Sequence, residues 1–204
     1  MKKLILAAGV AALLSACAGG MSGNSGMSGS SSSMGMSGNA MPTASVMVGG
    51  APMLPTRDII DNAVNSRDHT TLVAAVKQAG LVDTLKGPGP FTVFAPTNAA
   101  FGLLPQSTVS TLMSPPGKPM LTKVLTYHVV PGRMDSAALG QAIRAGGGTA
   151  TLTTVAGVPL RARMVGSNIE LLDAQGNAAM VTTANVYQSN GVIHVIDHVL
   201  IPGN

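Results

Sequence analysis

The sequence predicts an α+β fold, with helices gathered in the first half of the domain and antiparallel strands in the second. Three observations support this prediction. Apolar residues recur at helical spacing through much of residues 56–145. After Gly146, Gly147 and Gly148, the pattern changes to short alternating runs rich in β-branched residues. One apolar run, residues 91–95, has the pattern of a buried strand, and it must return to the sheet formed by the later strands.

Caps and apolar stripes predict the first two helices. Thr56 can cap a helix that runs to about Ser66, because the apolar residues of that segment fall on one stripe. Asp68 or Thr70 can start a second helix. Gly80 lies where this helix should end, since glycine readily takes the left-handed conformation found after helices.

The middle of the chain combines the buried strand with short helices. The strand at residues 91–95 is expected to stop at Pro96, because proline has no N–H to give to a sheet. Thr97 or Asn98 then caps a short helix. Further helices are predicted over residues 107–113, about 121–128 and 136–145.

The second half of the domain is predicted to be antiparallel strands. The runs alternate apolar and polar residues, and turn signals such as Asn190-Gly191 separate them. The expected strands cover residues 149–154, 158–165, 168–172, 179–186 and 191–201.

Composition and charge exclude several classes of function. Without Lys2 and Lys3 of the leader, the chain has ten basic residues against eight acidic ones. The basic residues are scattered and lack interleaved aromatic residues, so nucleic-acid binding is not predicted. The run of residues 146–148 is not followed by Lys-Ser or Lys-Thr, and no serine has a nucleophile-elbow pattern. The sequence therefore predicts neither an enzyme nor a bound cofactor.

Residues 1–17 are predicted to be a lipoprotein signal peptide. Lys2 and Lys3 precede an apolar run over residues 4–14, which is shorter than the about 20 residues that a bilayer-spanning helix needs. The sequence LSAC that ends at Cys17 resembles the bacterial lipobox, in which the cysteine is acylated. Cys17 is the only cysteine of the chain; the alternative is an ordinary cleaved signal. The resemblance implies export and a lipid anchor, with Ala18 favouring the outer membrane.

Residues 18–54 are rich in Gly, Ser and Met and nearly free of charge, so they are predicted to be a disordered tether. Methionines recur along this segment, and Met34 and Met36 are the closest pair. Thioethers suit Cu(I) and can also consume oxidants. A copper or oxidant accessory function of the tether is therefore an alternative to a plain linker, although no His or Cys joins the methionines.

Three motifs carry a resemblance to a known family. Residues 91–101 have the sequence FTVFAPTNAAF, Tyr127 and His128 form a pair, and residues 190–197 have the sequence NGVIHVID. Their order and spacing resemble the fasciclin domain, over residues 55–204. The resemblance implies a β-wedge or sandwich of mainly antiparallel strands, with helices packed along one edge. It also implies adhesion through protein or glycan contacts, without a cofactor or enzymatic activity.

The resemblance also marks residues that could bind a partner. In animal relatives, the region of Tyr127 and His128 is linked to receptor contact; the alternative is that both residues pack in the core. An integrin-linked motif of animal fasciclin domains falls on Asn185, Val186 and Tyr187. Its acidic residue is replaced by Asn185. Integrin-type recognition, which needs that carboxylate, is therefore not expected.

His194 and His198 are not expected to form a metal site. On one strand, four residues of separation place them about 13 Å apart, which is too far for a shared ion. No Glu or Cys lies beside them in the sequence to complete a ligand set.

The leading hypothesis is a non-enzymatic adhesion or envelope-interaction module, lipid-anchored in the bacterial envelope and reaching outward on its tether. Its partner is expected to be a surface protein or glycan of the envelope or matrix, with a role in attachment or biofilm. A glycan-stacking site has little support, since the chain has no Trp and only Tyr127 and Tyr187 as tyrosines.

Overall fold

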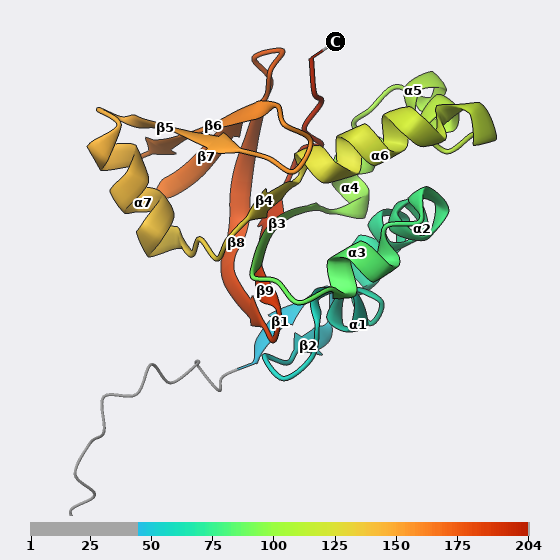
Figure 1. Cartoon of the computed structure of the whole chain (residues 1–204), viewed down its shortest axis with the longest axis horizontal. Coiled ribbons are helices and arrows are strands. Elements are labelled where there is room, and N and C mark those ends of the chain that lie inside the picture. Colours follow the sequence, from blue (N-terminus) through green and yellow to red (C-terminus); the bar gives the residue numbers. More distant parts are fainter. Residues whose placement is uncertain (1–44, 204) are drawn as a thin grey trace, which may run out of the picture. The chain divides into compact units, whose positions relative to one another are not determined.

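The computed structural model describes residues 45–203 (Figure 1). The predicted leader, its lipidation site Cys17, and the methionines Met34 and Met36 lie outside the described residues. Within residues 45–203, no helix is long and apolar enough to cross a membrane. The structure therefore bears on the predicted domain and on the last part of the predicted tether.

Seven strands form the main sheet, in the order β4-β3-β9-β8-β7-β6-β5. Their bounds are β3 Phe91–Pro96, β4 Val129–Pro131, β5 Thr149–Thr153, β6 Pro159–Val165, β7 Asn168–Leu172, β8 Ala178–Gln188 and β9 Gly191–Ile196. Neighbouring strands are antiparallel except β3 and β9, which are parallel. The fold is therefore α+β with a mainly antiparallel sheet, as predicted.

The parallel pair β3 and β9 brings two sequence motifs together at the centre of the sheet. Phe91 lies opposite Gly191, and the register continues to Pro96 opposite Ile196. Nearly every residue of both strands is buried, because both faces of this part of the sheet are covered. The prediction that residues 91–95 return to the sheet is confirmed.

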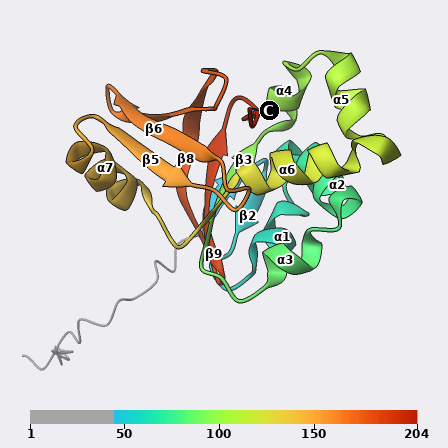
Figure 2. The same ribbon diagram turned by 45° about the horizontal axis from the view of Figure 1, so that its top comes forward.

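The helices lie on two sides of this central pair. They are α1 Ile59–Ala63, α2 Thr70–Ala79, α3 Val82–Lys86, α4 Asn98–Gly102, α5 Gln106–Leu112, α6 Lys118–Tyr127 and α7 Ser136–Ala145. Single 3-10 turns precede α2 and α6, at Arg67–His69 and Pro115–Gly117. Helices α1 to α6 gather on one side, whereas α7 packs against β5 and β6 on the other (Figures 1 and 2).

Two apolar clusters fill the spaces on either side of β3 and β9. The first lies among helices α1 to α6 and includes Val93 and Ile193. The second lies beneath α7 and includes Phe94 and Leu139. Because successive residues of a strand point to opposite faces, Val93 and Phe94 enter different clusters. The central strands therefore connect both cores within one compact unit.

The sheet curves until its two outermost strands approach each other. The N–H of Val155, in the turn after β5, donates to the carbonyl oxygen of Val129 in β4 at 2.8 Å. The N–H of Ala156 donates to the carbonyl oxygen of Thr126 at 3.3 Å. These bonds satisfy backbone groups near the sheet edges, which would otherwise be open to pairing with other chains.

The helix caps agree with the sequence in part. Thr97 caps α4, and Gly80 ends α2 with a positive φ of 74°, as predicted. The first helix is shorter than predicted and is capped by Asp58 instead of Thr56. The reason is local: a turn closes between Leu54 and Arg57 first, and the Asp58 carboxylate then accepts from the N–H of Asp61.

The folded part begins before the predicted boundary at residue 55. Strands β1 (Val46–Val48) and β2 (Ala51–Met53) form a hairpin that belonged to the predicted tether. Val48 and Met53 are buried in the first cluster, so this segment does bury apolar surface. Gly49 and Gly50 take positive φ at the turn, a signal that the overall composition of residues 18–54 concealed.

Other corrections concern strand ends. Residues 129–131, for which the sequence pattern predicts no strand, form β4 and pair with β3. The last strand ends at Ile196 and not at residue 201, because Asp197 turns aside and its side chain accepts from the N–H of Met180. Strand β8 extends beyond the predicted end at residue 186, to Gln188.

Candidate functional site

Tyr127 ends helix α6, and its side chain is completely buried in the second apolar cluster. Its hydroxyl donates to the carbonyl oxygen of Pro159, at the start of β6, over 3.1 Å. Burial raises the pKa of Tyr127 and keeps the phenol neutral. The residue therefore links α6 to the sheet, and its ring lies away from the surface.

His128 follows Tyr127 and uses both ring nitrogens inside the protein. Nδ1 lies 2.8 Å from the carbonyl oxygen of Val124, and Nε2 accepts from the N–H of Leu200 at 3.0 Å. A proton on Nδ1 leaves Nε2 free to accept, so one neutral tautomer satisfies both bonds. Burial lowers the pKa of His128 to about 4, which favours that neutral form. This geometry fits the packing interpretation of the pair.

Strand β8 contains an irregularity at the other predicted partner-binding residues. Its register with β9 shifts between Val181 and Val186, and Asn185 there has a positive φ of 61°. Asparagine is among the few residues that tolerate this conformation. The Asn185 amide oxygen accepts from the N–H of Ser136, and its NH₂ group donates to the Ser136 hydroxyl, both at 2.7 Å. Asn185 therefore ties the bulge to the first turn of α7.

Tyr187 and Asn185 are half-exposed, whereas Val186 between them is 1% exposed and packs in the first cluster. The Tyr187 hydroxyl lies 3.4 Å from a carboxylate oxygen of Asp135. Burial and the negative charge of Asp135 both raise the pKa of Tyr187. The other oxygen of Asp135 caps α7 by accepting from the N–H of Ala138 at 2.8 Å.

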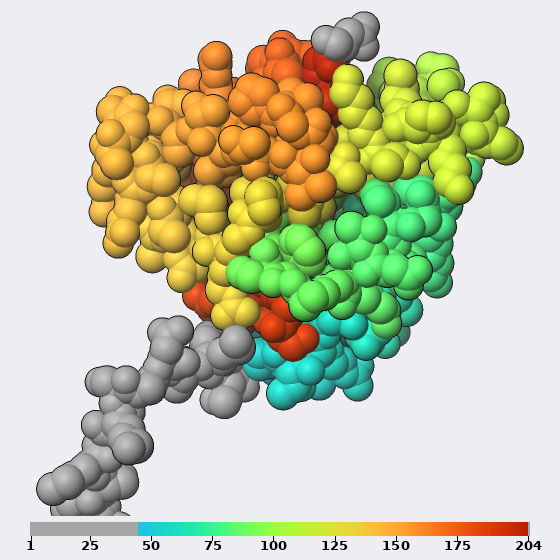
Figure 3. Space-filling view, viewed as in Figure 1, coloured from blue at the N-terminus to red at the C-terminus, as the bar shows by residue number. Residues whose placement is uncertain are grey.

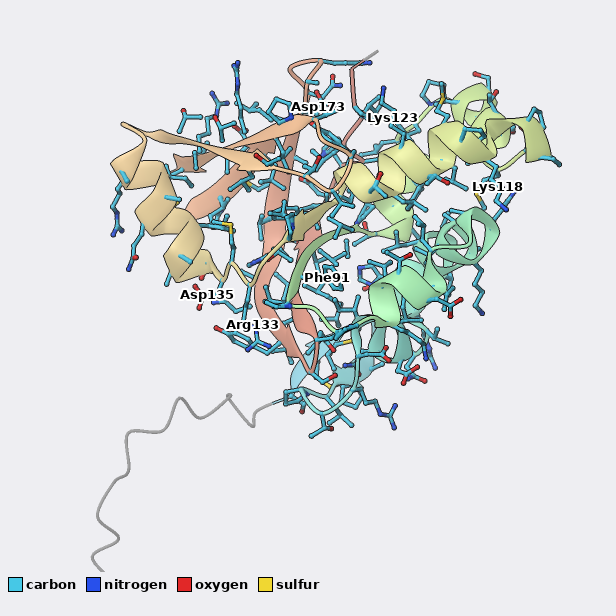
Figure 4. The ribbon with its side chains drawn as sticks, viewed as in Figure 1. Phe91, Lys118, Lys123, Arg133, Asp135 and Asp173 are labelled. Atoms are coloured by element: carbon cyan, nitrogen blue, oxygen red, sulfur yellow. The ribbon has the colours of Figure 1, made fainter. Side chains whose placement is uncertain are left out.

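These contacts define a polar surface where β8 meets the start of α7. Arg133 and Asp135 lie at this junction (Figure 4), and a guanidinium nitrogen of Arg133 donates to the carbonyl oxygen of Gln188 at 3.4 Å. We call this surface the bulge site, and it consists of Arg133, Asp135, Ser136, Asn185 and Tyr187. It presents a guanidinium, a carboxylate, a phenol, a hydroxyl and an amide, which together can donate and accept hydrogen bonds.

The sequence does not predict three of the five residues of the bulge site. Ser136 was expected only as the start of a helix, and nothing in the sequence connects Arg133 or Asp135 with Tyr187. Ser136 and Asn185 are 49 residues apart along the chain, and Asp135 and Tyr187 are 52 apart, so the fold alone brings them together. The usable signal was Asp135 immediately before a helical stripe, which is typical of a cap.

The histidines outside this surface are separated by their environments. His194 is buried in β9, where Nε2 lies 2.8 Å from the carbonyl oxygen of Met134 and the ring stacks on Phe94 at 5.7 Å between centroids. Burial lowers its pKa. His198 lies beyond the end of β9, so the expectation that it shares a strand face with His194 is wrong. His198 is exposed, and its Nδ1 lies within hydrogen-bond distance of a carboxylate oxygen of Asp197. Among residues 45–203, no group of three or more His, Cys, Asp or Glu could hold a metal ion.

His128 and Val186, from the two predicted groups, line one apolar cavity between the helices and the central strands. The cavity also borders His69, whose Nδ1 lies 2.9 Å from the hydroxyl oxygen of Ser66. Its volume is about 40 Å³, far below the roughly 300–1,000 Å³ of typical small-molecule pockets. The cavity therefore does not accommodate a metabolite in this conformation.

The sequence of the folded part matches a known domain family. A family model, the fasciclin domain, matches residues 67–202. The chain belongs to the fasciclin family. Two of the family's motifs lie far apart in the fasciclin sequence but form adjacent strands, because β3 pairs in parallel with β9.

Fasciclin relatives include proteins of several bacteria. The chain is 41% identical over 158 residues to protein sll1483 of Synechocystis. The aligned residues cover 78% of this chain and 81% of the relative. It is 32% identical over 166 residues to the cell surface glycolipoprotein MPB83 of Mycobacterium bovis, over 79% of this chain and 66% of the relative. One similar protein is thus named for a cell-surface location.

A solved structure supports the fold. The FAS1 domain pair of the insect cell adhesion molecule fasciclin I aligns with a TM-score of 0.52 and 24% identity. The alignment covers 64% of this chain and 43% of the insect chain. At this identity the likeness concerns the fold.

Proposed function

We propose that the chain is a lipid-anchored, exported fasciclin module that acts by adhesion and without catalysis. The observation that carries this proposal is membership of the fasciclin family, together with a relative named as a cell surface glycolipoprotein. Acylation of Cys17 supplies the anchor, and the residues before β1 supply the reach. The partner is a protein or glycan of the envelope or matrix.

Within this proposal, the bulge site is the surface that contacts the partner. All five of its residues are partly exposed, and two of them, Asn185 and Tyr187, come from the motif that the family resemblance marked. Tyrosine offers a broad apolar ring and a polar tip, a combination enriched at interfaces. Tyr127, His128 and Val186 act from the interior, by fixing the strands and helices that carry this surface.

The anchor and the contact can be tested separately. In a deletion strain, the wild-type gene should restore attachment to a surface and biofilm. Cys17→Ser should move the protein out of the membrane fraction. Tyr187→Ala should leave it in the membrane but reduce attachment, and Met164→Ala, on β6, serves as the matched control for loss of a large side chain. A deletion strain that attaches like its parent would argue strongly against the proposal.

A photo-crosslinker identifies the partner. Placed at residue 187, it should capture an envelope protein or glycan that the same group at residue 164 does not. Equal products at both positions would place the contact elsewhere on the domain.

A further inference from the structure

A second surface, distant from α7, combines exposed apolar side chains with lysines. Helices α5 and α6 project from the body at the end away from α7 (Figures 1 to 3). Leu103, just after α4, is 63% exposed, and Met120 on α6 is 53% exposed. We call the surface formed by α4, α5 and α6 the α4–α6 face.

The charge of this face has one sign. Residues 84–134 contain no Asp or Glu, whereas Lys118 and Lys123 project from α6 (Figure 4). Exposed Lys77 on α2 adds a third positive charge. The next residue, Gln78, donates a hydrogen bond to the carbonyl oxygen of Met113, just beyond α5, so this end of α2 lies beside α5. Helices α4, α5 and α6 therefore carry positive charges only, in a chain whose formal net charge is +4. Exposed Arg67 and Asp68, in the 3-10 turn beside α4, offset one another.

An open groove of about 350 Å³ runs along the same face, between α5, α6 and the C-terminal segment. Leu104, Met120 and Lys123 line it, so the apolar and cationic groups adjoin one another. The nearest turn carries Asp173, but this carboxylate is buried and accepts from three backbone N–H groups and from the Asn177 amide. These bonds hold the carboxylate within its turn, and its single negative charge offsets only part of the charge of the lysines.

The positive charges of the α4–α6 face come from lysine and not from arginine, which bears on the kind of anionic surface that the face can bind. Helices α4, α5 and α6 contain no arginine, whose planar fork pairs with fixed carboxylates of a protein partner; the nearest arginine is Arg67, in the 3-10 turn beside α4. Lysine is a point charge on a flexible stem, which suits a diffuse negative surface. Apolar side chains that project from helices can enter the boundary between lipid head groups and acyl chains without a shape-matched partner.

We propose that the α4–α6 face rests on an anionic phospholipid bilayer. Three lysines are fewer than the roughly four to eight basic residues of a membrane-recruiting cluster, so this face binds weakly alone. It orients a domain that is already held near the membrane, where the tether raises the effective concentration. In this respect the inference rests on the anchor of the proposed function. With the face on the lipid, the bulge site at the start of α7 points away from it and stays open to a partner.

The test uses the mature protein purified from cells and asks which part of the domain contacts lipid. An environment-sensitive dye is attached through Met120→Cys, or through Met164→Cys on β6 as control. The wild-type chain, which lacks the introduced cysteine, is treated with the same dye to measure non-specific labelling. Each protein is mixed with vesicles of phosphatidylethanolamine and phosphatidylglycerol, or of phosphatidylcholine alone, that contain lipid-borne quenchers. Quenching at residue 120 should exceed that at residue 164 several-fold, and only on the anionic vesicles.

Charge variants sharpen the result. Lys118→Gln with Lys123→Gln should abolish the preferential quenching, whereas Arg144→Gln with Arg161→Gln removes the same charge elsewhere and should leave it unchanged. Raising the salt from about 0.1 to 1 M shortens the screening length from about 10 to 3 Å and should also abolish it. Equal quenching at residues 120 and 164 on membrane-bound protein would overturn the inference while leaving the anchor intact. Capture of an acidic protein by this face, with no lipid contact, would overturn it as well.

Discussion

Two motifs of this domain, each containing tyrosine, are used in opposite ways. Tyr127 and His128 are buried, and their polar atoms bond backbone groups from distant parts of the chain. Asn185 and Tyr187 stand half-exposed around a bulge. A similar polar composition thus serves stability in one region and remains accessible in the other. The difference lies in where each hydrogen-bonding group finds its partner.

The largest effect is expected from His128→Leu. The variant leaves the buried N–H of Leu200 without an acceptor, and the carbonyl oxygen of Val124 keeps only the backbone N–H of His128. Leaving buried polar groups unsatisfied should lower the free energy of unfolding by about 3 kcal/mol. Urea unfolding measures the change, with exposed His198→Ala as control, expected within about 0.5 kcal/mol of wild type. A stable His128→Leu protein that fails in attachment would assign the motif to recognition instead.

Acid should lower the free energy of unfolding by a similar amount, through the buried His128. Burial lowers the pKa of His128 to about 4 from 6.5, so the unfolded chain takes up a proton first as the pH falls. The stabilising contribution is therefore full above pH 6.5 and is lost between pH 6.5 and about 4, on the order of 3 kcal/mol. Buried His69 and His194, with lowered pKa values, act in the same direction.

Urea midpoints measured from pH 7.5 to pH 4 test this slope. His128→Gln keeps a polar side chain that does not titrate in this range, and its profile should be flatter than that of wild type. Equal slopes for both proteins would remove His128 from the explanation of acid sensitivity.

A smaller loss is expected at the bulge. Asn185→Ala removes two hydrogen bonds to Ser136 and places a Cβ-bearing residue without a compensating polar group at a positive φ. The free energy of unfolding should fall by about 1–2 kcal/mol. Asn185→Gly loses the same bonds but tolerates the backbone, so it should lose less. If both variants matched wild type in thermal unfolding, the bulge would not depend on this side chain.

The smallest structural effect is expected from Tyr187→Phe. The hydroxyl bond to Asp135 is long, at 3.4 Å, so stability should change by less than about 0.5 kcal/mol. If the phenol contacts a partner, attachment should nevertheless decrease. Unfolding and attachment measured on one preparation separate the two effects, and a parallel loss of both would make Tyr187 another packing residue.

Much of the fold was predictable, because local rules and tertiary packing agree there. Helix α7 and strand β7 have the predicted bounds, since their apolar spacing, flanking caps and turns are unambiguous. The hairpin of β1 and β2 was missed because a Gly- and Met-rich composition hid two short apolar runs. Strand β4 was missed because three residues carry too little pattern to be recognised.

Apolar periodicity, caps and turns act over a few residues, so the chain's own pattern predicts the fold class, the family and the order of most elements. It also marked Tyr127, His128 and Asn185 as unusual. Which of these residues is accessible depends on long-range contacts. Burial and hydrogen bonding depend on partners such as Leu200, Pro159 and Ser136, which lie 32 to 72 residues away, and no local pattern encodes such pairings.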